Sequence, residues 1–444
     1  MQKILLRFLL GFVLVSVPCL AKDDNTLRRL TGGVKVEPDG SIHAASDEEM
    51  LAVGQWLTSV MQPIPQDLTA SVPLRKISLK RLDAEIRTIA EKKGEFTDTV
   101  RYLGGLMSIQ YVIAVPEEHD IILAGPGEGW VTDKTGNVIG RDSKLPVFSL
   151  EDFLTVFRAW GGTVKQDIIS CSFDLTPEAE KNTAQLGKDF AGMSANNAEA
   201  FAVALRQASG DLQVTFTGIA AASRFAKILA AADFKMKLYA LGLEQPPVRT
   251  LPSYTALLTG ASPKMLTRFY LVPEYAEVLH DSAKLTWQLG DTKIKVLTEY
   301  DYLLRQNKRD ARGKPDRAAT NWSSKFETQF ESVAKKQPVF NVLKNDMHLA
   351  LVTALIHQER LLQKANCFLP MFLDETKLRP LTYPKPVSVP SRTAVSQNGY
   401  ATVVVCGGIE INPFPILQKV RLESKMDKDR NHLIKMTGSS WREN

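Results

Sequence analysis

The side chains that could bind a metal ion are scattered along this chain and match no known ligand motif. Neither an HExxH nor a CxxC pattern occurs in the sequence. His348 and His357 are predicted to share a helix, but a spacing of nine residues at about 100° each places them on opposite faces. One ion cannot bind both, so the sequence predicts no metal centre and no cofactor. The full set of histidines is His43, His119, His280, His348, His357 and His432.

Nucleophilic catalysis has equally little support in the sequence. No GxSxG elbow occurs, and Cys171 stands in ISCSF, a stretch typical of a buried strand. The glycine-rich residues 125–129 lack the spacing of a phosphate-binding loop and are interpreted as a connector between hairpins. No catalytic residue is therefore predicted. A hydrolase built on two facing carboxylates leaves no spacing signature, so this alternative stays open.

Three cysteines follow residue 21: Cys171, Cys367 and Cys406. An odd number in an oxidising compartment allows one disulfide and one free thiol. We expect Cys367 and Cys406 to form that disulfide, because both lie in the C-terminal part of the chain. The alternative, three buried reduced cysteines, stays open.

The first 21 residues have the three parts of a secretory signal peptide. Lys3 and Arg7 form a positive start, residues 8–17 are apolar, and Cys19 and Ala21 frame a small-x-small cleavage site. The apolar run is shorter than the ~20 residues that a membrane-spanning helix needs, and no later run approaches that length. We therefore expect an exported bacterial protein, periplasmic or extracellular, with no membrane span after cleavage.

The charge of the expected mature chain is nearly balanced. Removing Lys3 and Arg7 from 55 basic residues leaves 53, against 49 acidic ones. This balance does not predict a nucleic-acid partner. An apolar content of 44% and a charged content of 23% are typical of a globular protein with ordinary cores.

Residues 211–254 are the stretch around which the predicted elements are organised. The pattern predicts a strand at 212–216, a helix at 223–234 and a second strand at 235–243. Pro246 then prevents the last strand from continuing. A crossover between the two strands favours a parallel or split pairing.

The predicted helix in this stretch is amphipathic. Phe225, Ile228 and Leu229 fall on one face, and Arg224 and Lys227 face away from it. The apolar face is interpreted as core packing. Neither charged residue is assigned a role.

The other predicted elements follow from turn and capping signals. Ser149 and Asp152 are expected to cap the helix that starts at residue 150, and the strands at 285–289 and 293–300 form a pair joined at Gly290. The remaining predictions are hairpins at 32–44, 110–126 and 130–140, helices at 47–61 and 79–93, a helix through Trp322 and Phe330, a second helix that starts at Asn345 or Asp346, and a hairpin at Asn398-Gly399.

Together these elements predict an α+β fold with hairpin-rich mixed sheets, a central strand–helix–strand unit, a helical pair and a C-terminal β-region. The predicted divisions are a signal peptide at 1–21, an N-terminal α+β region at 22–165, a central α+β region at 166–304, a charged loop and helical region at 305–378, and a Pro-rich linker with a C-terminal hairpin and polar tail at 379–444.

Three long segments resemble one known family: RYLGGLMSIQYVIAVPEEHDIILAGPGEGWV, RFAKILAAADFKMKLYALGLEQPPVRTLPSY and WSSKFETQFESVAKKQPVFNVLKNDMHLALVTALI. They are similar to a secreted bacterial family, best known from planctomycetes and catalogued as domain of unknown function 1598. The resemblance covers residues 74–356. It implies an exported protein without an assigned activity and supplies no catalytic residue for any position of this chain.

The function expected from these observations is binding and not catalysis. Export, many hairpins and the lack of a recognisable catalytic pattern favour a cell-envelope or periplasmic protein that binds an envelope protein or a surface polymer. The alternative is a secreted hydrolase whose carboxylate- or histidine-based site is assembled only in the folded chain.

Overall fold

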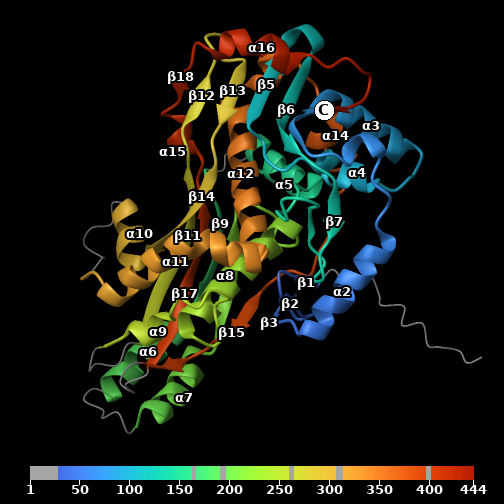
Figure 1. Ribbon diagram of the computed structural model, residues 1–444. Coiled ribbons are helices and arrows are strands. Elements are labelled where there is room, and N and C mark those ends of the chain that lie inside the picture. Colours follow the sequence, from blue (N-terminus) through green and yellow to red (C-terminus); the bar gives the residue numbers. More distant parts are fainter. Residues whose placement is uncertain (1–28, 163–166, 191–196, 260–264, 307–313, 397–401) are drawn as a thin grey trace, which may run out of the picture.

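The computed structural model describes residues 29–162, 167–190, 197–259, 265–306, 314–396 and 402–444. Helices and strands from all parts of the chain combine into several mostly antiparallel sheets with helices packed around them (Figure 1). The fold is therefore α+β, as predicted. The expected signal peptide at 1–21 and the expected turn at Asn398-Gly399 lie outside the described residues.

The first large sheet, here called the central sheet, joins strands that are far apart in sequence. Its order is β14 (Thr292–Thr298), β11 (Leu266–Tyr275), β17 (Thr402–Ile411), β9 (Ile169–Asp174), β10 (Asp211–Thr217) and β15 (Ser388–Pro390), with β16 (Ala394–Val395) paired to β17. β11 and β17 run parallel, and the other neighbours are antiparallel. Every residue of β17 is buried, as expected for a strand covered on both faces.

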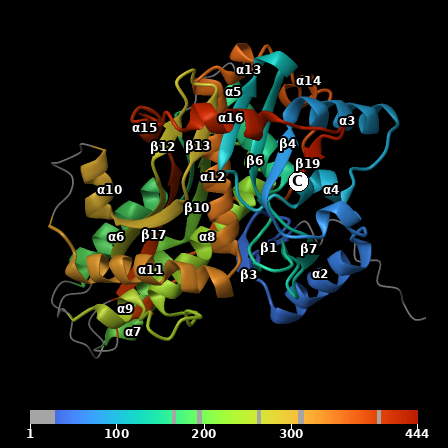
Figure 2. The same cartoon turned by 45° about the horizontal axis from the view of Figure 1, so that its top comes forward.

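The second large sheet, here called the distal sheet, lies in the upper half of Figure 1. Its order is β18 (Arg421–Leu422), β12 (Val278–His280), β13 (Thr286–Leu289), β5 (Tyr111–Val115), β6 (Asp120–Gly127), β4 (Val72–Ser78) and β19 (Arg442–Glu443). α16 (Met426–Ile434) lies across β5 and β13, where its Leu433 joins a small apolar cluster with Ile113, Val115 and Ile122. The end of the chain thus returns to its N-terminal part (Figure 2).

Two small sheets complete the strands. They are β1 (Leu30–Thr31), β2 (Val34–Val36) and β3 (Ile42–Ala44) in one sheet, and β7 (Trp130–Thr132) with β8 (Val138–Gly140) in the other. The hairpins predicted at 32–44, 110–126 and 130–140 are confirmed by these strands and by the β5–β6 pair. β16 and β17 also pair as the predicted C-terminal hairpin requires.

Helices of very different length fill the space around the sheets. They are α2 (Asp47–Val60), α3 (Leu79–Glu91), α4 (Asp98–Arg101), α5 (Leu150–Gly161), α6 (Pro177–Asp189), α7 (Ala198–Ser209), α8 (Arg224–Leu241), α9 (Tyr254–Leu257), α10 (Glu299–Arg305), α11 (Arg317–Lys336), α12 (Val339–Gln358), α13 (Leu361–Lys364), α14 (Pro370–Leu373) and α15 (Phe414–Leu417). The predicted α2 and α3 are confirmed, with Ser46 and Ser78 as their N-caps.

α12 stands at the centre of the core, in contact with α5, α8, α11 and β14. Among the described residues it is the one helix long and apolar enough to cross a membrane, but 89% of its most apolar window is buried inside the protein. The expectation that no membrane span follows the signal peptide stays a prediction. The start of α12 was predicted too late, because the helix begins at Val339 and not at Asn345 or Asp346.

The predicted strand at 235–243 is wrong, because α8 continues without a break to Leu241. Met236 and Leu238 alternate with lysines in this segment, which resembles a strand with one polar face. Both lysines instead have partners inside the protein. Lys237 pairs with Asp233 one turn earlier, and Lys235 pairs with Glu244 at 2.7 Å.

The expectation that Arg224 and Lys227 face away from the core is also wrong for Lys227, which is only 2% exposed. α8 lies between the central sheet on one side and α5, α12 and the N-terminal hairpin on the other. Because neighbours surround it, all residues from 225 to 241 are buried. A helix covered on every side cannot keep a solvent-facing stripe.

The strands predicted as a pair joined at Gly290 do not pair with each other. β13 lies between β12 and β5 in the distal sheet, and β14 pairs with β11 in the central sheet. The two strands therefore connect the two large sheets.

The predicted disulfide between Cys367 and Cys406 is also wrong, because Cys171, Cys367 and Cys406 are all free and buried. Burial in apolar surroundings raises the pKa of all three thiols, to about 12 for Cys367 and Cys406. The alternative of three buried reduced cysteines is the one that the structure supports.

Candidate functional site

A cavity of about 360 Å³ lies where the N-terminal hairpin, α2, α5, α8 and α12 meet. Residues 378–383, an extended segment after α14, cross one side of it. We call this space the arginine cavity, after the side chains described below. It differs from an apolar core void because charged groups enter it from several elements.

The walls of the arginine cavity are mainly apolar. α2, α5, α8 and α12 each contribute apolar side chains to them. The residues involved include Met50, Val53, Leu57, Leu154, Ile228, Val339 and Val342. An apolar body could thus be held on several sides.

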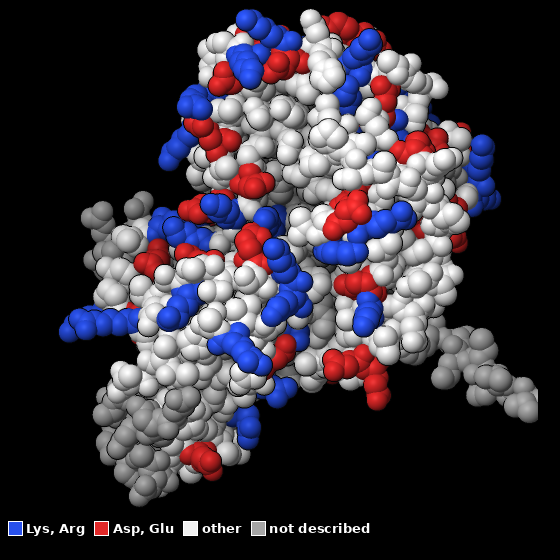
Figure 3. Space-filling model, in the orientation of Figure 1, with Lys and Arg blue, Asp and Glu red and all other residues white. Residues whose placement is uncertain are grey.

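Four arginines line the cavity, Arg101, Arg158, Arg224 and Arg379, together with one carboxylate, that of Glu151. The lining is therefore strongly positive. Over the face shown in Figure 3, in contrast, basic and acidic side chains are interspersed. Arg158 holds the cavity wall in place, because its guanidinium donates to three backbone carbonyls at 2.7, 3.3 and 3.0 Å.

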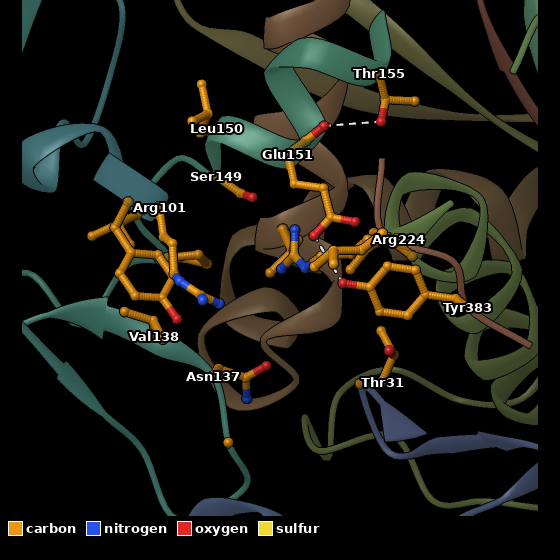
Figure 4. A pocket seen from close by; sticks show the side chains of 18 of the residues that line it. Thr31, Arg101, Asn137, Val138, Ser149, Leu150, Glu151, Thr155, Arg224 and Tyr383 are labelled. Atoms are coloured by element: carbon orange, nitrogen blue, oxygen red, sulfur yellow. Dashed lines mark hydrogen bonds between the residues drawn. The ribbon is translucent and has the colours of Figure 1, made fainter. Parts of the chain in front are cut away.

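Arg224 is the first residue of α8, and it pairs with the buried Asp152 of α5. Ser149 is the N-cap of α5 by position, but its side chain makes no capping hydrogen bond. The predicted capping by Ser149 and Asp152 is therefore wrong, although the helix itself is present. Asp152 pairs with Arg224 instead. The Ser149 hydroxyl points into the space between Arg101 and Arg224 (Figure 4).

Val339 and Val342 of α12 line the cavity. Asp346 lies on the same face of this helix, because it follows Val339 by seven residues, which is about two helical turns. Its carboxyl is buried, and its Oδ2 has no hydrogen-bond partner among the described residues. Burial raises the pKa of Asp346 to about 8, and the positive charge of Arg224 opposes that shift. Asp152 and Asp346 thus both act on Arg224.

Glu151 and Tyr383 close the cavity on the side of the extended segment. The Tyr383 hydroxyl donates to Glu151 Oε2 at 2.8 Å (Figure 4). Lys227 Nζ lies 4.9 Å from the centre of the Tyr383 ring. Burial lowers the pKa of Lys227 to about 7, with a further lowering by Arg224 and an opposite effect of Glu151.

Arg101 enters the cavity from α4 and points toward the same space as Arg224 in Figure 4. Its Nε donates to the carbonyl of Phe96 at 2.9 Å, and its terminal nitrogens have no partner among the described residues. The adjacent Tyr102 is influenced by both arginines. Burial raises the pKa of Tyr102 to about 12, and Arg224 and Arg101 oppose that shift.

The residues considered for chemistry in the sequence lie outside this cavity. His348 is held by Thr292 and by the carbonyl of Ile109, at 2.9 and 2.8 Å, and His357 by the carbonyl of Phe157 at 2.9 Å. Burial lowers the pKa of both histidines, and the backbone hydrogen bonds to Ile109 and Phe157 oppose that shift. Cys171 faces the core from β9. In the described residues, no group of three or more His, Cys, Asp or Glu side chains could hold a metal ion.

The glycine-rich residues 125–129 have a structural role in the described fold. The carboxylate of Glu128 accepts from the backbone N–H groups of Asp142 and Ser143, at 2.8 and 3.2 Å, and thereby ties this segment to the turn after β8. Gly127 packs against the Arg75 side chain, so a larger residue would clash there. The predicted connector is shorter than expected, because residues 125–127 form the end of β6 and only residues 128 and 129 connect it to β7.

Sequence reasoning missed the cavity residues Arg101, Glu151, Arg224 and Tyr383. One weak signal was available for Arg224. It directly follows the N-cap Ser223, and the N-terminus of a helix disfavours a positive charge. This unfavourable position of the positive charge is compensated by the ion pair with Asp152 of α5.

Residues 171–254 match the sequence model of a family described as a protein of unknown function (DUF1598). The match runs from within β9 to the first residue of α9 and includes Arg224 of the cavity lining and the nearby Lys227. The resemblance expected over residues 74–356 is therefore found for this part of the chain. No curated protein and no solved structure matches the chain.

Proposed function

We propose that this chain is an exported, non-catalytic binding protein and that the arginine cavity holds a small organic molecule. The observation that carries the proposal is the cavity itself. Its volume of about 360 Å³ lies in the range of about 300–1,000 Å³ typical of small-molecule sites. Apolar walls with a few convergent polar groups are the usual composition of such sites.

The alternative is a hydrolase with a carboxylate- or histidine-based site, and its glycosidase form requires two carboxyl groups that face each other across the site. No histidine lines the described cavity. The described lining contributes one carboxyl group, that of Glu151, and its Oε2 already accepts from Tyr383. Asp152 and Asp346 lie behind the lining beside Arg224. This arrangement favours binding over hydrolysis.

Export remains part of the proposal, supported by the residue pattern of the first 21 positions. N-terminal sequencing of the native protein tests it, and a chain that still begins at Met1 would contradict it. An envelope protein or a surface polymer remains the proposed macromolecular partner. Isolation of the protein alone and soluble from native envelope fractions would count against that partner.

A neutral, environment-sensitive fluorophore, N-phenyl-1-naphthylamine, tests the cavity. The wild-type protein is expected to increase its fluorescence in a saturable way. Val53→Trp, which places an indole at the cavity wall on α2, is expected to weaken binding by at least about tenfold, because it fills the space that the probe occupies.

The matched control is Leu51→Trp on the same helix. Leu51 is 47% exposed and does not line the cavity, so this variant should bind the probe as the wild type does. No saturable signal with the wild type, or equal affinity of the Val53→Trp protein, would overturn the proposal.

A further inference from the structure

The cavity geometry points to the class of the ligand, an inference that rests on the proposed binding function. We infer that the arginine cavity binds an organic anion, a carboxylate or phosphate monoester joined to an apolar body. The anionic group would lie between Arg101 and Arg224, and the apolar body would lie against α2, α8 and α12.

The first argument is the balance of charge in the lining. Four arginines and one carboxylate line the cavity. The side chains of Arg101 and Arg379 are exposed, so the cavity opens to solvent on their side and the anionic group of a ligand can reach them. Arg224 is partly balanced by Asp152, and Glu151 accepts from Tyr383. Arg101 and Arg379 have no carboxylate partner among the described residues, so the lining retains a positive excess.

The second argument is the geometry around Arg101. The bond from its Nε to the carbonyl of Phe96 fixes the guanidinium, and the terminal nitrogens remain available for a ligand. A guanidinium presents paired N–H donors that match both carboxylate and phosphate oxygens. The Ser149 hydroxyl, which does not cap α5, points toward the same space (Figure 4).

The third argument is the apolar remainder of the cavity. Met50, Val53 and Leu57 line the cavity from one face of α2, and Ile228 and Val342 line it from α8 and α12. Inorganic anions would leave these walls without a partner. A ligand with an apolar part buries them and gains the corresponding transfer free energy.

The experiment compares four ligands of equal chain length as competitors of N-phenyl-1-naphthylamine: decanoate, decyl phosphate, decanol and decyltrimethylammonium. Decanoate or decyl phosphate is expected to displace the probe at concentrations at least about tenfold lower than decanol, because an ionised hydrogen bond adds to the apolar contact. The difference between decanoate and decyl phosphate distinguishes the two anionic groups.

Two variants locate the anionic group. Arg101→Gln is expected to weaken binding of the anion by about tenfold and to leave the affinity for decanol unchanged. Arg141→Gln removes the same charge from an exposed position outside the cavity and should change neither ligand. A loss of affinity for decanol as large as that for the anion would show that Arg101 only supports the fold.

The possible results separate the two proposals. If the fluorophore binds and decanol displaces it as well as decanoate does, the binding function stands and the anion inference is wrong. Preference for decyltrimethylammonium would also overturn the inference. If the fluorophore does not bind in a saturable way, the proposed function itself is wrong.

Discussion

Arg224 at the start of α8 pairs with Asp152 in the first turn of α5, and this ion pair joins the two helices that begin at the arginine cavity. Asp152 is only 2% exposed in its side chain, whereas that of Arg224 is 31% exposed. The pair thus has a buried acidic end and a basic end that reaches the cavity. This relationship positions Arg224 and accounts for the loss of the expected cap on α5.

We expect Asp152→Asn to lower the free energy of unfolding by about 1–3 kcal/mol, because a hydrogen bond to a charged group is lost in a buried place. Urea unfolding followed by circular dichroism measures the change. The control is Glu85→Gln, which removes a carboxylate from the exposed side of α3. Equal stability of the two variants would contradict a structural role of the pair.

Asp346→Asn tests the buried carboxyl on α12 through its pH dependence. The pKa of Asp346 is raised from an ordinary value of 3.8 to about 8 in the folded protein. Between these values the folded state binds more protons than the unfolded state, so this group lowers stability as pH rises. The Asp346→Asn protein should therefore have the same free energy of unfolding as the wild type near the lower of these two pH values. Above a pH of about 8 the variant should be the more stable protein.

Lys227 has the opposite effect on the pH dependence of wild-type stability. Because its pKa is lowered from 10.5 to about 7, the free energy of unfolding rises with pH between these two values. The useful quantity is therefore the difference between Asp346→Asn and wild type, measured by urea unfolding at each pH. A variant that is less stable than wild type at alkaline pH would show that the Asp346 charge is needed for folding.

Binding of an anion to the cavity should strengthen as pH falls. Below a pH of about 8 Asp346 loses its negative charge, and below about 7 Lys227 gains a positive one. The charged groups around them are Arg224 and Glu151, so both changes make the cavity more positive. Decanoate, which stays ionised in this range, should bind several-fold more tightly, and decanol should not change. Constant or weaker decanoate binding at lower pH would contradict this account.

The three cysteines should react only after unfolding. Cys171, Cys367 and Cys406 are buried and free, and burial raises the pKa of each thiol. Since the thiolate is the reactive form, the native protein should react slowly with Ellman's reagent. In denaturant without reductant, all three positions should be alkylated, as mass spectrometry can show. A disulfide-linked peptide that contains Cys367 and Cys406 would restore the original prediction.

Leu229→Ala tests the packing of α8 as a buried helix. Leu229 is fully buried, and removal of a buried leucine side chain costs about 2–5 kcal/mol. Val203→Ala, a truncation on α7 at a site that is 44% exposed, should change stability by less than about 0.5 kcal/mol. Both values come from urea unfolding. A loss at Leu229 no larger than at Val203 would be incompatible with its position in the core.

Local signals in the sequence were enough to predict α2, α3 and the short hairpins. A capping serine, an apolar stripe and a tight turn each act within a few residues, so their structural result depends little on the rest of the chain. The start of α6 is of the same local kind, because Thr176 caps the helix and Pro177 is its first residue. The α+β class followed from these elements together.

The sequence by itself therefore determined several helices with clear caps or apolar stripes and the short hairpins, and only the tertiary structure decided how they combine. The placement of β13 and β14 in different sheets and the continuation of α8 through Lys235 and Lys237 depend on partners from distant segments. The arginine cavity has the same origin, because α4, α5, α8 and residues 378–383 contribute its polar groups. A buried charge is stable only beside its partner, and that proximity is a property of the folded chain and not of any local pattern.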